Sequence, residues 1–243
     1  MAELKAVVLC AGRGRRLAPL TENRPKCLLP IGNKTILEHI LDNLDGIDPG
    51  EIILVTGFKS RMIEDLVSGK RGRRFRFVLN ENYSSTNTAY SLNRALRVMD
   101  SDFILINGDV FFDKGILAEL VGNPQKNCVV VDRRAALNEE EVKVMADGSR
   151  LVRIGKDLEH GECLGEAIGI NKLSKETIRS LRDVFDDLEA GGECHHFFEI
   201  GIDRLISRAL SFGIQWTEKA WIEIDTIEDY HSANDDIYRK LFP

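Results

Sequence analysis

The chain has 243 residues, 43 % of them hydrophobic, and a formal net charge of −6 at pH 7. This length suits one large α/β domain, and the acidic total argues against a protein that binds nucleic acid over a broad basic face. No apolar run is long enough to span a bilayer, and the five scattered cysteines predict free thiols, so we expect a cytoplasmic protein without a membrane segment.

The first predicted strand, Lys5–Cys10, leads into a turn that carries Gly12 and Gly14. Glycine lets bare backbone approach a ligand closely and offer its N–H groups to phosphate oxygens. Residues 11–34 hold one acid, Glu22, and six basic residues: Arg13, Arg15, Arg16, Arg24, Lys26 and Lys34. Such a concentration of positive charge on an acidic chain predicts a small polyanion bound at one place.

Two better-known phosphate loops do not fit this stretch. The Rossmann fingerprint needs a small residue where the chain has Leu17, and Pro19 would interrupt the helix that should follow. A Walker loop needs Gly-Lys-Ser/Thr, which the chain lacks. The remaining expectation is a triphosphate held by backbone N–H groups and arginine side chains. A simple tight turn is the alternative for the two glycines alone.

Alternating strand and helix patterns follow the turn. Thr35 and Glu38 form a capping box at the start of a helix. A buried strand is predicted at Glu51–Thr56 and a further strand at Phe75–Leu79, with a helix between them. Strand, helix and strand in succession imply a parallel sheet with helices on its faces. The basic run over residues 70–76 is predicted to be a solvated turn, with electrostatic guidance of an anion as the less favoured alternative.

The polar segment over residues 80–92 follows a predicted parallel strand, at the sheet edge where doubly wound folds bind ligands. Side-chain amides and exposed backbone there could read the edge of a nucleotide base. A loop whose Asn, Ser and Thr side chains cap their own backbone is the alternative.

Acidic residues follow two further predicted strands. Asp109 comes after the strand Phe103–Asn107 and after Gly108, which permits close approach of a ligand. In the stretch WIEIDT near the C-terminus, strand alternation places Glu223 and Asp225 on one face. Two carboxylates so close would repel without a cation between them, and hard cations such as Mg²⁺ prefer oxygen ligands. The sequence therefore predicts a magnesium site, with a solvated loop aspartate as the alternative at Asp109.

The remaining elements form the second half of the chain. A hairpin over residues 141–156 turns at an Asp-Gly pair and is followed by a strand over residues 165–170. Helices are predicted from Ser174 and over residues 197–209, each from its apolar stripe.

Several of these motifs resemble one family. GRGRRLAPLTENRPKCLL, which begins at Gly12, is similar to the G-x-G-x-R-L and P-K-x-L signature of nucleotidyltransferases that join a nucleoside triphosphate to a phosphorylated sugar or alcohol. NGDVFF, which contains Asp109, matches that family's metal-binding motif. WIEIDT resembles the bacterial choline-phosphate cytidylyltransferases and their aminoalkyl-phosphonate relatives, whereas hexose-phosphate enzymes usually have aspartate, glycine and threonine there. The resemblance implies a Rossmann-like, GT-A-like α/β fold, with helices on both faces of a mixed, mainly parallel sheet, in a single domain.

The resemblance also implies a nucleotide-binding half over about residues 1–130 and an acceptor-binding half over about residues 131–243. The expected catalytic residues are Arg16, Lys26, Asp109 and Asp225, and the expected metal ligands are Asp109, Glu223 and Asp225. The expected nucleotide-binding residues are Leu9, Ala11, Gly12, Arg13, Gly14, Arg15, Asn80, Thr88, Ala89 and Gly108. The expected acceptor-binding residues are Lys156, Glu166 and Glu199. A lysine in solvent at a strand end and an exposed helical glutamate are the alternatives at Lys156 and Glu199.

The implied reaction is magnesium-dependent transfer of the nucleoside monophosphate of CTP to phosphocholine, 2-aminoethylphosphonate or a similar acceptor, with release of pyrophosphate. A choline group would need aromatic faces, and the right part of the chain holds Trp216, Trp221, Phe197, Phe198 and Tyr230. A primary amine would instead need carboxylates such as Glu199 or Glu166. A sugar 1-phosphate or inositol phosphate acceptor is the alternative within this class, and a nucleotide-sensing module without turnover is the alternative outside it.

Overall fold

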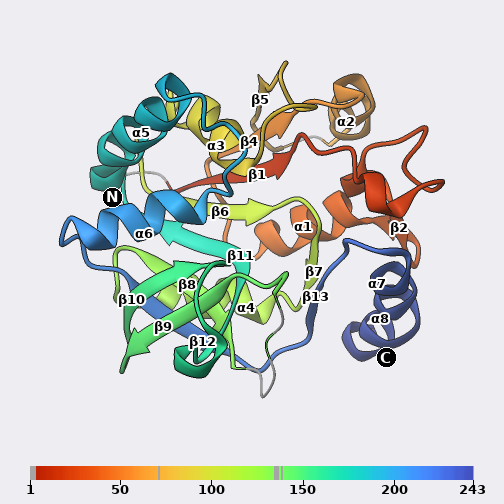
Figure 1. Ribbon diagram of the computed structural model, residues 1–243. Helices are drawn as coiled ribbons and strands as arrows, with labels where there is room; N and C mark the ends of the chain where they lie inside the picture. Colours follow the sequence, from red (N-terminus) through yellow and green to blue (C-terminus); the bar gives the residue numbers. More distant parts are fainter. Residues whose placement is uncertain (1–3, 71, 134–136, 138, 243) are drawn as a thin grey trace.

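The computed structural model describes residues 4–70, 72–133, 137 and 139–242, and a large mixed sheet runs through them (Figure 1). Its strand order is β5-β4-β1-β6-β11-β8-β12-β10-β9. The strands of this sheet are β1 (Lys5–Cys10), β4 (Glu51–Thr56), β5 (Phe75–Leu79), β6 (Phe103–Asn107), β8 (Cys128–Asp132), β9 (Lys143–Asp147), β10 (Arg150–Gly155), β11 (Gly165–Leu173) and β12 (Gly213–Thr217). Helices cover both faces of the sheet, so the expected α/β fold is confirmed.

The parallel part of the sheet lies around β1. β4 and β6 flank β1 in parallel register, with Val8 beside Leu54 on one side and Ile106 on the other. Such strands are buried on both faces, which explains their nearly continuous apolar sequences. The adjacent residues Val7 and Val8 therefore belong to two separate hydrophobic cores, one on each face of the sheet.

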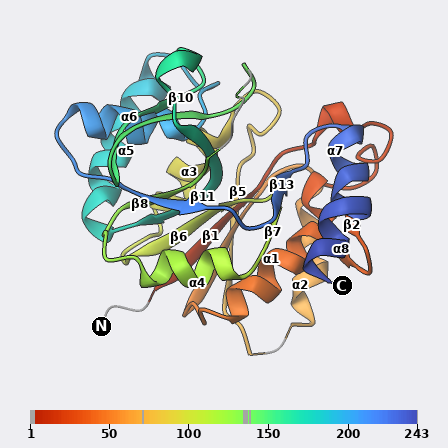
Figure 2. The ribbon, with the colours of Figure 1, turned by 90° about the horizontal axis from the view of Figure 1, so that it is seen from below.

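Two groups of helices close these cores (Figure 2). The group on the Val8 face consists of α1 (Ile36–Asp45), α2 (Ser60–Ser68) and α4 (Gly115–Gly122). The group on the Val7 face consists of α3 (Thr88–Leu96), α5 (Lys175–Ala190) and α6 (Glu199–Ser207). The C-terminal helices α7 (Ile227–Ser232) and α8 (Tyr238–Leu241) add apolar side chains to the first core.

Antiparallel strands extend the sheet beyond β6. β11 pairs with β6, with Ile170 opposite Ile106, and on its other side with β8. β9 and β10 form the predicted hairpin, and its turn contains Gly148 at φ +62°. β11 therefore joins strands from both halves of the chain into one sheet.

A short antiparallel ladder lies outside the large sheet. β13 (Trp221–Glu223) pairs with β7 (Val110–Phe112), and Glu223 lies opposite Val110. The strand that precedes the C-terminal helices is therefore placed directly against the segment that follows β6.

Most predicted helix boundaries are confirmed to within two residues. The capping boxes of Thr35 with Glu38 at α1 and of Thr226 with Asp229 at α7 are both present. The helix predicted over residues 197–209 begins at Glu199 and ends at Ser207.

The basic run over residues 70–76 is attached to the fold by ion pairs. Lys70 Nζ lies 3.6 Å from Glu38 Oε1, and Arg76 Nε lies 3.0 Å from Glu51 Oε1. Arg71 lies outside the described residues. Two cations of this run are therefore paired with carboxylates of the protein itself, and no bound anion is needed to explain them. All five cysteines are free, as predicted, and within the described part of the chain no helix is long and apolar enough to cross a membrane.

Candidate active site

The backbone conformation of the glycine turn after β1 requires glycine at position 14. Gly14 adopts the left-handed conformation at φ +72°, and a Cβ there would lie 2.9 Å from Cβ of Lys26. The hydroxyl of Thr21 donates a hydrogen bond to the Gly14 carbonyl at 2.7 Å. Short 3₁₀ helices, Arg15–Leu17 and Lys26–Leu28, follow the turn. The turn is therefore packed against the segment that carries Lys26.

Lys26 connects this turn to acids that are distant in the sequence. Its Nζ lies 2.8 Å from Asp109 Oδ2 and also forms an ion pair with Asp225. Burial alone would lower the pKa of Lys26, but the charges of Asp109, Asp225 and Glu223 outweigh it and raise that pKa. Arg16 adds a second cation, with its guanidinium 2.6 Å from Asp225 Oδ2. The predicted catalytic residues Arg16, Lys26, Asp109 and Asp225 are thus brought together.

Local backbone structure places the acids. Gly108 precedes Asp109, and a Cβ at Gly108 would lie 2.5 Å from the Leu9 carbonyl oxygen, so β1 and the end of β6 meet closely only with glycine there. The Ile224 amide donates to the Asp109 carbonyl at 3.0 Å. Carboxylate oxygens of Asp109, Glu223 and Asp225 consequently lie within 4.8 Å of one another.

The electrostatics of the acids favour a bound cation. Burial and the charges of Asp109 and Asp225 raise the pKa of Glu223 to about 8. Burial would raise the pKa of Asp225 as well, but Lys26 and Arg16 hold it below its ordinary value. Asp109 Oδ1 is buried and receives no hydrogen bond from the residues that the structure describes. Three convergent carboxylates with an unused buried oxygen are a donor set that suits Mg²⁺.

The polar segment after β5 is held in place by its own side chains. Asn80 is 2 % exposed, and its amide nitrogen donates to Thr86 Oγ1 at 3.1 Å and to Ser91 Oγ at 3.0 Å. Its amide oxygen accepts from the Asn82 amide. The side chain of Asn80 therefore organises the loop, and direct contact of Asn80 with a base stays a prediction.

The start of α3 contacts the segment that leads into α6. Thr88 Oγ1 accepts from the Phe198 amide at 2.9 Å, and the Ala89 amide donates to the His196 carbonyl at 3.2 Å. These groups are predicted to bind nucleotide, and in this structure they join two segments of the protein. Their role toward a base stays a prediction.

Most of the other predicted nucleotide-binding residues surround the turn. A cavity of about 30 Å³ is lined by Leu9, Gly12 and Gly108 together with Lys26 and Asp109. The Ala11 carbonyl accepts from the Phe58 amide, and the Arg13 guanidinium lies 5.2 Å from the centre of the Phe58 ring. A second hollow, of about 220 Å³, is lined by Arg13, Arg15, Ala18, Thr21 and Glu22.

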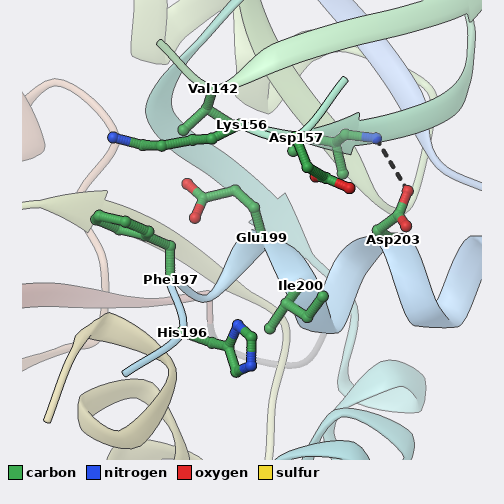
Figure 3. Close-up of a pocket in the computed structure, with 10 residues that line it drawn as sticks. Val142, Lys156, Asp157, His196, Phe197, Glu199, Ile200 and Asp203 are labelled. Atoms are coloured by element: carbon green, nitrogen blue, oxygen red, sulfur yellow. Dashed lines mark hydrogen bonds between the residues drawn. The ribbon is translucent and has the colours of Figure 1, made fainter. Parts of the chain in front are cut away.

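A larger pocket, of about 380 Å³, lies between β10 and α6 (Figure 3). Lys156 and Glu199 line it, and Lys156 Nζ lies 4.3 Å from the centre of the Phe197 ring. Glu199 is 4 % exposed, so the alternative of an exposed helical glutamate is wrong. Burial raises the pKa of Glu199 to about 7, although the charge of Lys156 opposes this shift.

Glu166 occupies a different place. It is buried on β11, where it pairs with Asp132 of β8 and Lys143 of β9, and it is not among the described residues that line the pocket. Its predicted contact with the acceptor stays a prediction.

The pattern analysis missed two residues that shape the pocket. Lys143 is 2 % exposed, and its ammonium donates to the Lys156 carbonyl at 2.6 Å. Asp203 accepts from the Ile154 amide at 3.1 Å and from Arg153 Nε at 2.8 Å. A lysine between two valines in a predicted strand was the one signal for Lys143. Asp203 gave no signal beyond a polar position on a helix.

The chain is similar in sequence to known proteins. The chain is 35 % identical over 131 residues to CMP-5'-(3-aminopropyl)phosphonate synthase of Streptomyces rubellomurinus. The aligned segment covers 54 % of this chain and only 21 % of that protein. It is 25 % identical over 236 residues to choline-phosphate cytidylyltransferase of Streptococcus pneumoniae, and this alignment covers 96 % of this chain and 97 % of that protein.

The fold is also found among solved structures. The inositol-1-phosphate CTP transferase of T. maritima superimposes with a TM-score of 0.84 at 21 % identity, over 99 % of this chain and 96 % of the other. In sequence, the family model for the MobA-like NTP transferase domain matches residues 6–167, from β1 through Asp109 and into β11. The chain therefore belongs to the family of MobA-like NTP transferase domains.

Proposed function

We propose that this protein is a magnesium-dependent cytidylyltransferase that joins the CMP part of CTP to a small phosphorylated alcohol or phosphonate and releases pyrophosphate. The observation that carries the proposal is the contact of Lys26 with Asp109 and Asp225 beside the glycine turn. Cytidine nucleotides are named for both relatives described above, which supports CTP as the donor.

In the proposed reaction, an anionic oxygen of the acceptor attacks the α-phosphorus of CTP. A new oxygen–phosphorus bond forms as the bond to the bridging oxygen breaks, and pyrophosphate leaves in line. Lys26 and Arg16 counter the negative charge on the triphosphate as the leaving group departs. Asp109, Glu223 and Asp225 would hold Mg²⁺, which when bound neutralises charge on the phosphates.

The other predicted residues position the substrates. In this proposal the triphosphate lies along the backbone of Leu9, Ala11, Gly12, Gly14 and Gly108, with Arg13 and Arg15 at its outer side. The loop organised by Asn80 and the start of α3 at Thr88 and Ala89 receive the base. Lys156 and Glu199 contact the acceptor in their shared pocket. Glu166 supports the strand behind that pocket.

The acid cluster and the pocket also distinguish the proposal from its two alternatives, a nucleotide sensor and an enzyme with a sugar or inositol phosphate acceptor. A nucleotide sensor has no need of the convergent Asp109, Glu223 and Asp225, so the acid cluster favours turnover. A sugar 1-phosphate or inositol phosphate acceptor would be recognised through hydroxyl groups. The buried carboxylate of Glu199 in the pocket suits a cationic acceptor better.

The test is pyrophosphate release with each of the four common nucleoside triphosphates. The acceptors are phosphocholine, 2-aminoethylphosphonate, inositol 1-phosphate and glucose 1-phosphate. We expect turnover with CTP and one of the first two acceptors, with dependence on Mg²⁺. Release with none of these pairs would contradict the proposal.

Asp109→Asn tests the site itself. It should lower kcat/KM by about a hundredfold or more, because it removes a charged ligand and leaves an amide in its place. Asp48→Asn, at an exposed loop aspartate far from the cluster in sequence, is the matched control and should leave turnover unchanged. Full turnover in Asp109→Asn would remove Asp109 from the mechanism.

A further inference from the structure

Glu199 has a buried oxygen that nothing in the described protein satisfies. The side chain is 4 % exposed, and Oε2 makes no hydrogen bond. A carboxylate oxygen in such a place is destabilising unless a donor or a cation reaches it. The position of Glu199 is therefore explained if a bound molecule supplies a hydrogen-bond donor.

The other carboxylates around the pocket do not have this requirement. Asp203 accepts hydrogen bonds from the Ile154 amide and from Arg153 Nε (Figure 3 shows the bond to Ile154). Asp157 is exposed and can be hydrated. Among the described residues that line the pocket, Glu199 is thus the carboxylate with a buried oxygen that lacks a donor.

The described lining of the pocket offers few aromatic ring faces to a quaternary ammonium group, which has no N–H to donate. Phe197 is 42 % exposed, but Lys156 Nζ already lies over its ring. The His196 imidazole lies 3.1 Å from a carboxylate oxygen of Glu193. A quaternary ammonium binds through several ring faces, and the described residues that line this pocket do not supply such a cage.

The pocket also adjoins the acid cluster. The charge of Asp109 acts on Glu199, and that of Glu199 acts on Glu223. In Figure 3 the carboxylate of Glu199, the ring of Phe197 and the amine of Lys156 lie toward the same side of the pocket. A short molecule with an anionic end at Lys156 and a cationic end at Glu199 would lie across this region.

We propose that the acceptor is a short zwitterion whose primary ammonium group donates a hydrogen bond to Glu199, and that the pocket selects primary over quaternary ammonium. The inference rests on the proposed function, because the anionic end of the same molecule is the nucleophile of that reaction. The bond to Glu199 orients the acceptor and leaves the chemistry at the phosphorus unchanged.

Three phosphonates that share the reacting group and differ only at the tail test this selection. They are 2-aminoethylphosphonate, 2-(trimethylammonio)ethylphosphonate and propylphosphonate, in which a methyl group replaces the ammonium. With CTP and Mg²⁺, we expect kcat/KM for the primary amine to exceed that for each of the others by about tenfold or more. This follows because only the primary amine can satisfy the buried oxygen.

Glu199→Gln and Asp157→Asn form a matched pair of variants, since each removes one negative charge from the pocket. Glu199→Gln should lower kcat/KM for 2-aminoethylphosphonate about tenfold and change the values for the other two phosphonates less than about threefold. Asp157→Asn should keep the wild-type preference. Melting temperatures of both variants show that each is folded.

The outcomes separate the two proposals. Turnover of all three phosphonates at similar kcat/KM, or a preference for the quaternary amine, would overturn the inference and leave the cytidylyltransferase function standing. An equal loss with all three in Glu199→Gln would also overturn it, because Glu199 would then act on the phosphonate end or on the fold. Absence of pyrophosphate release from any nucleoside triphosphate with any acceptor would instead reject the function on which the inference rests.

Discussion

Lys26 is the residue on which the charge balance of the site depends. It lies between Asp109 and Asp225, and the three carboxylates around it lie within 4.8 Å of one another. Without a cation these acids would repel, and Glu223 shows the effect because its pKa is raised to about 8. Lys26 therefore holds the acids together, and in the reaction proposed above it would contact the phosphates once a nucleotide is bound.

Glu199 gives a prediction on stability and pH. Burial raises its pKa from 4.5 to about 7, with Lys156 opposing the shift and Asp109 adding to it. A carboxyl group whose pKa is raised by folding stabilises the fold fully below its unfolded value, and this stability is lost as the pH rises through the folded value. In Glu199→Gln no proton is lost, so the free energy of unfolding of the variant, relative to wild type, should rise by about 2 kcal/mol between pH 5 and pH 8.

Urea unfolding at pH 5, 6.5 and 8, without nucleotide or metal, measures this difference. Asp157→Asn is the control, because it removes a carboxylate at an exposed position of the same pocket. A difference for Glu199→Gln that is the same at all three values would show that Glu199 titrates as it does in the unfolded chain.

At the scale of elements, the start of α7 links helix capping to the acid cluster. Asp229 Oδ2 accepts from the Thr226 amide at 2.8 Å and from the Asp225 amide at 3.0 Å. Thr226 Oγ1 in turn accepts from the Asp229 amide. The capping box therefore fixes both the helix and the backbone of one predicted metal ligand.

Thr226→Ala should have two effects. Loss of the cap should lower the free energy of unfolding by about 1 kcal/mol. Loosening of the Asp225 backbone should raise, severalfold, the Mg²⁺ concentration needed for half-maximal turnover. Thr35→Ala removes an equivalent capping box, at α1, and is the matched control. It should cost similar stability and leave the Mg²⁺ dependence unchanged; an equal change in both variants would contradict a specific role for α7.

The elements also show which features could be predicted from sequence. β1, β6 and the Gly108-Asp109 pair were predictable because an apolar run and the residues that end it are local signals. The capping boxes were predictable for the same reason. The burial of Glu199 was not, because the face that α6 presents depends on β10, which lies far away in the sequence. The hydrogen bonds of Asn80 fit the alternative of a loop that caps its own backbone, and the sequence could not single out that alternative because the bonds depend on the path of the loop between β5 and α3.

At the scale of the whole molecule, the two halves of the chain share one sheet and its cores. β11, from the second half, lies between β6 and β8. Ile168 and Ile170 of β11 belong to the same core cluster as Val8 of β1. The site itself needs both halves, because Lys26 and Asp109 come from the first and Asp225 from the second. The boundary expected near residue 130 therefore does not coincide with a break in the sheet, since β8 runs across it.

This sharing predicts one cooperative unfolding transition. Tryptophan fluorescence reports on the second half, since Trp216 lies on β12 and Trp221 on β13, whereas far-UV circular dichroism reports on helices of both halves. Because the cores are common to both halves, urea should unfold them together, and the two signals should give the same midpoint and the same slope. A fluorescence midpoint displaced from the dichroism midpoint would show that residues 131–243 unfold separately, and the chain would then be better described as two domains with the site at their junction.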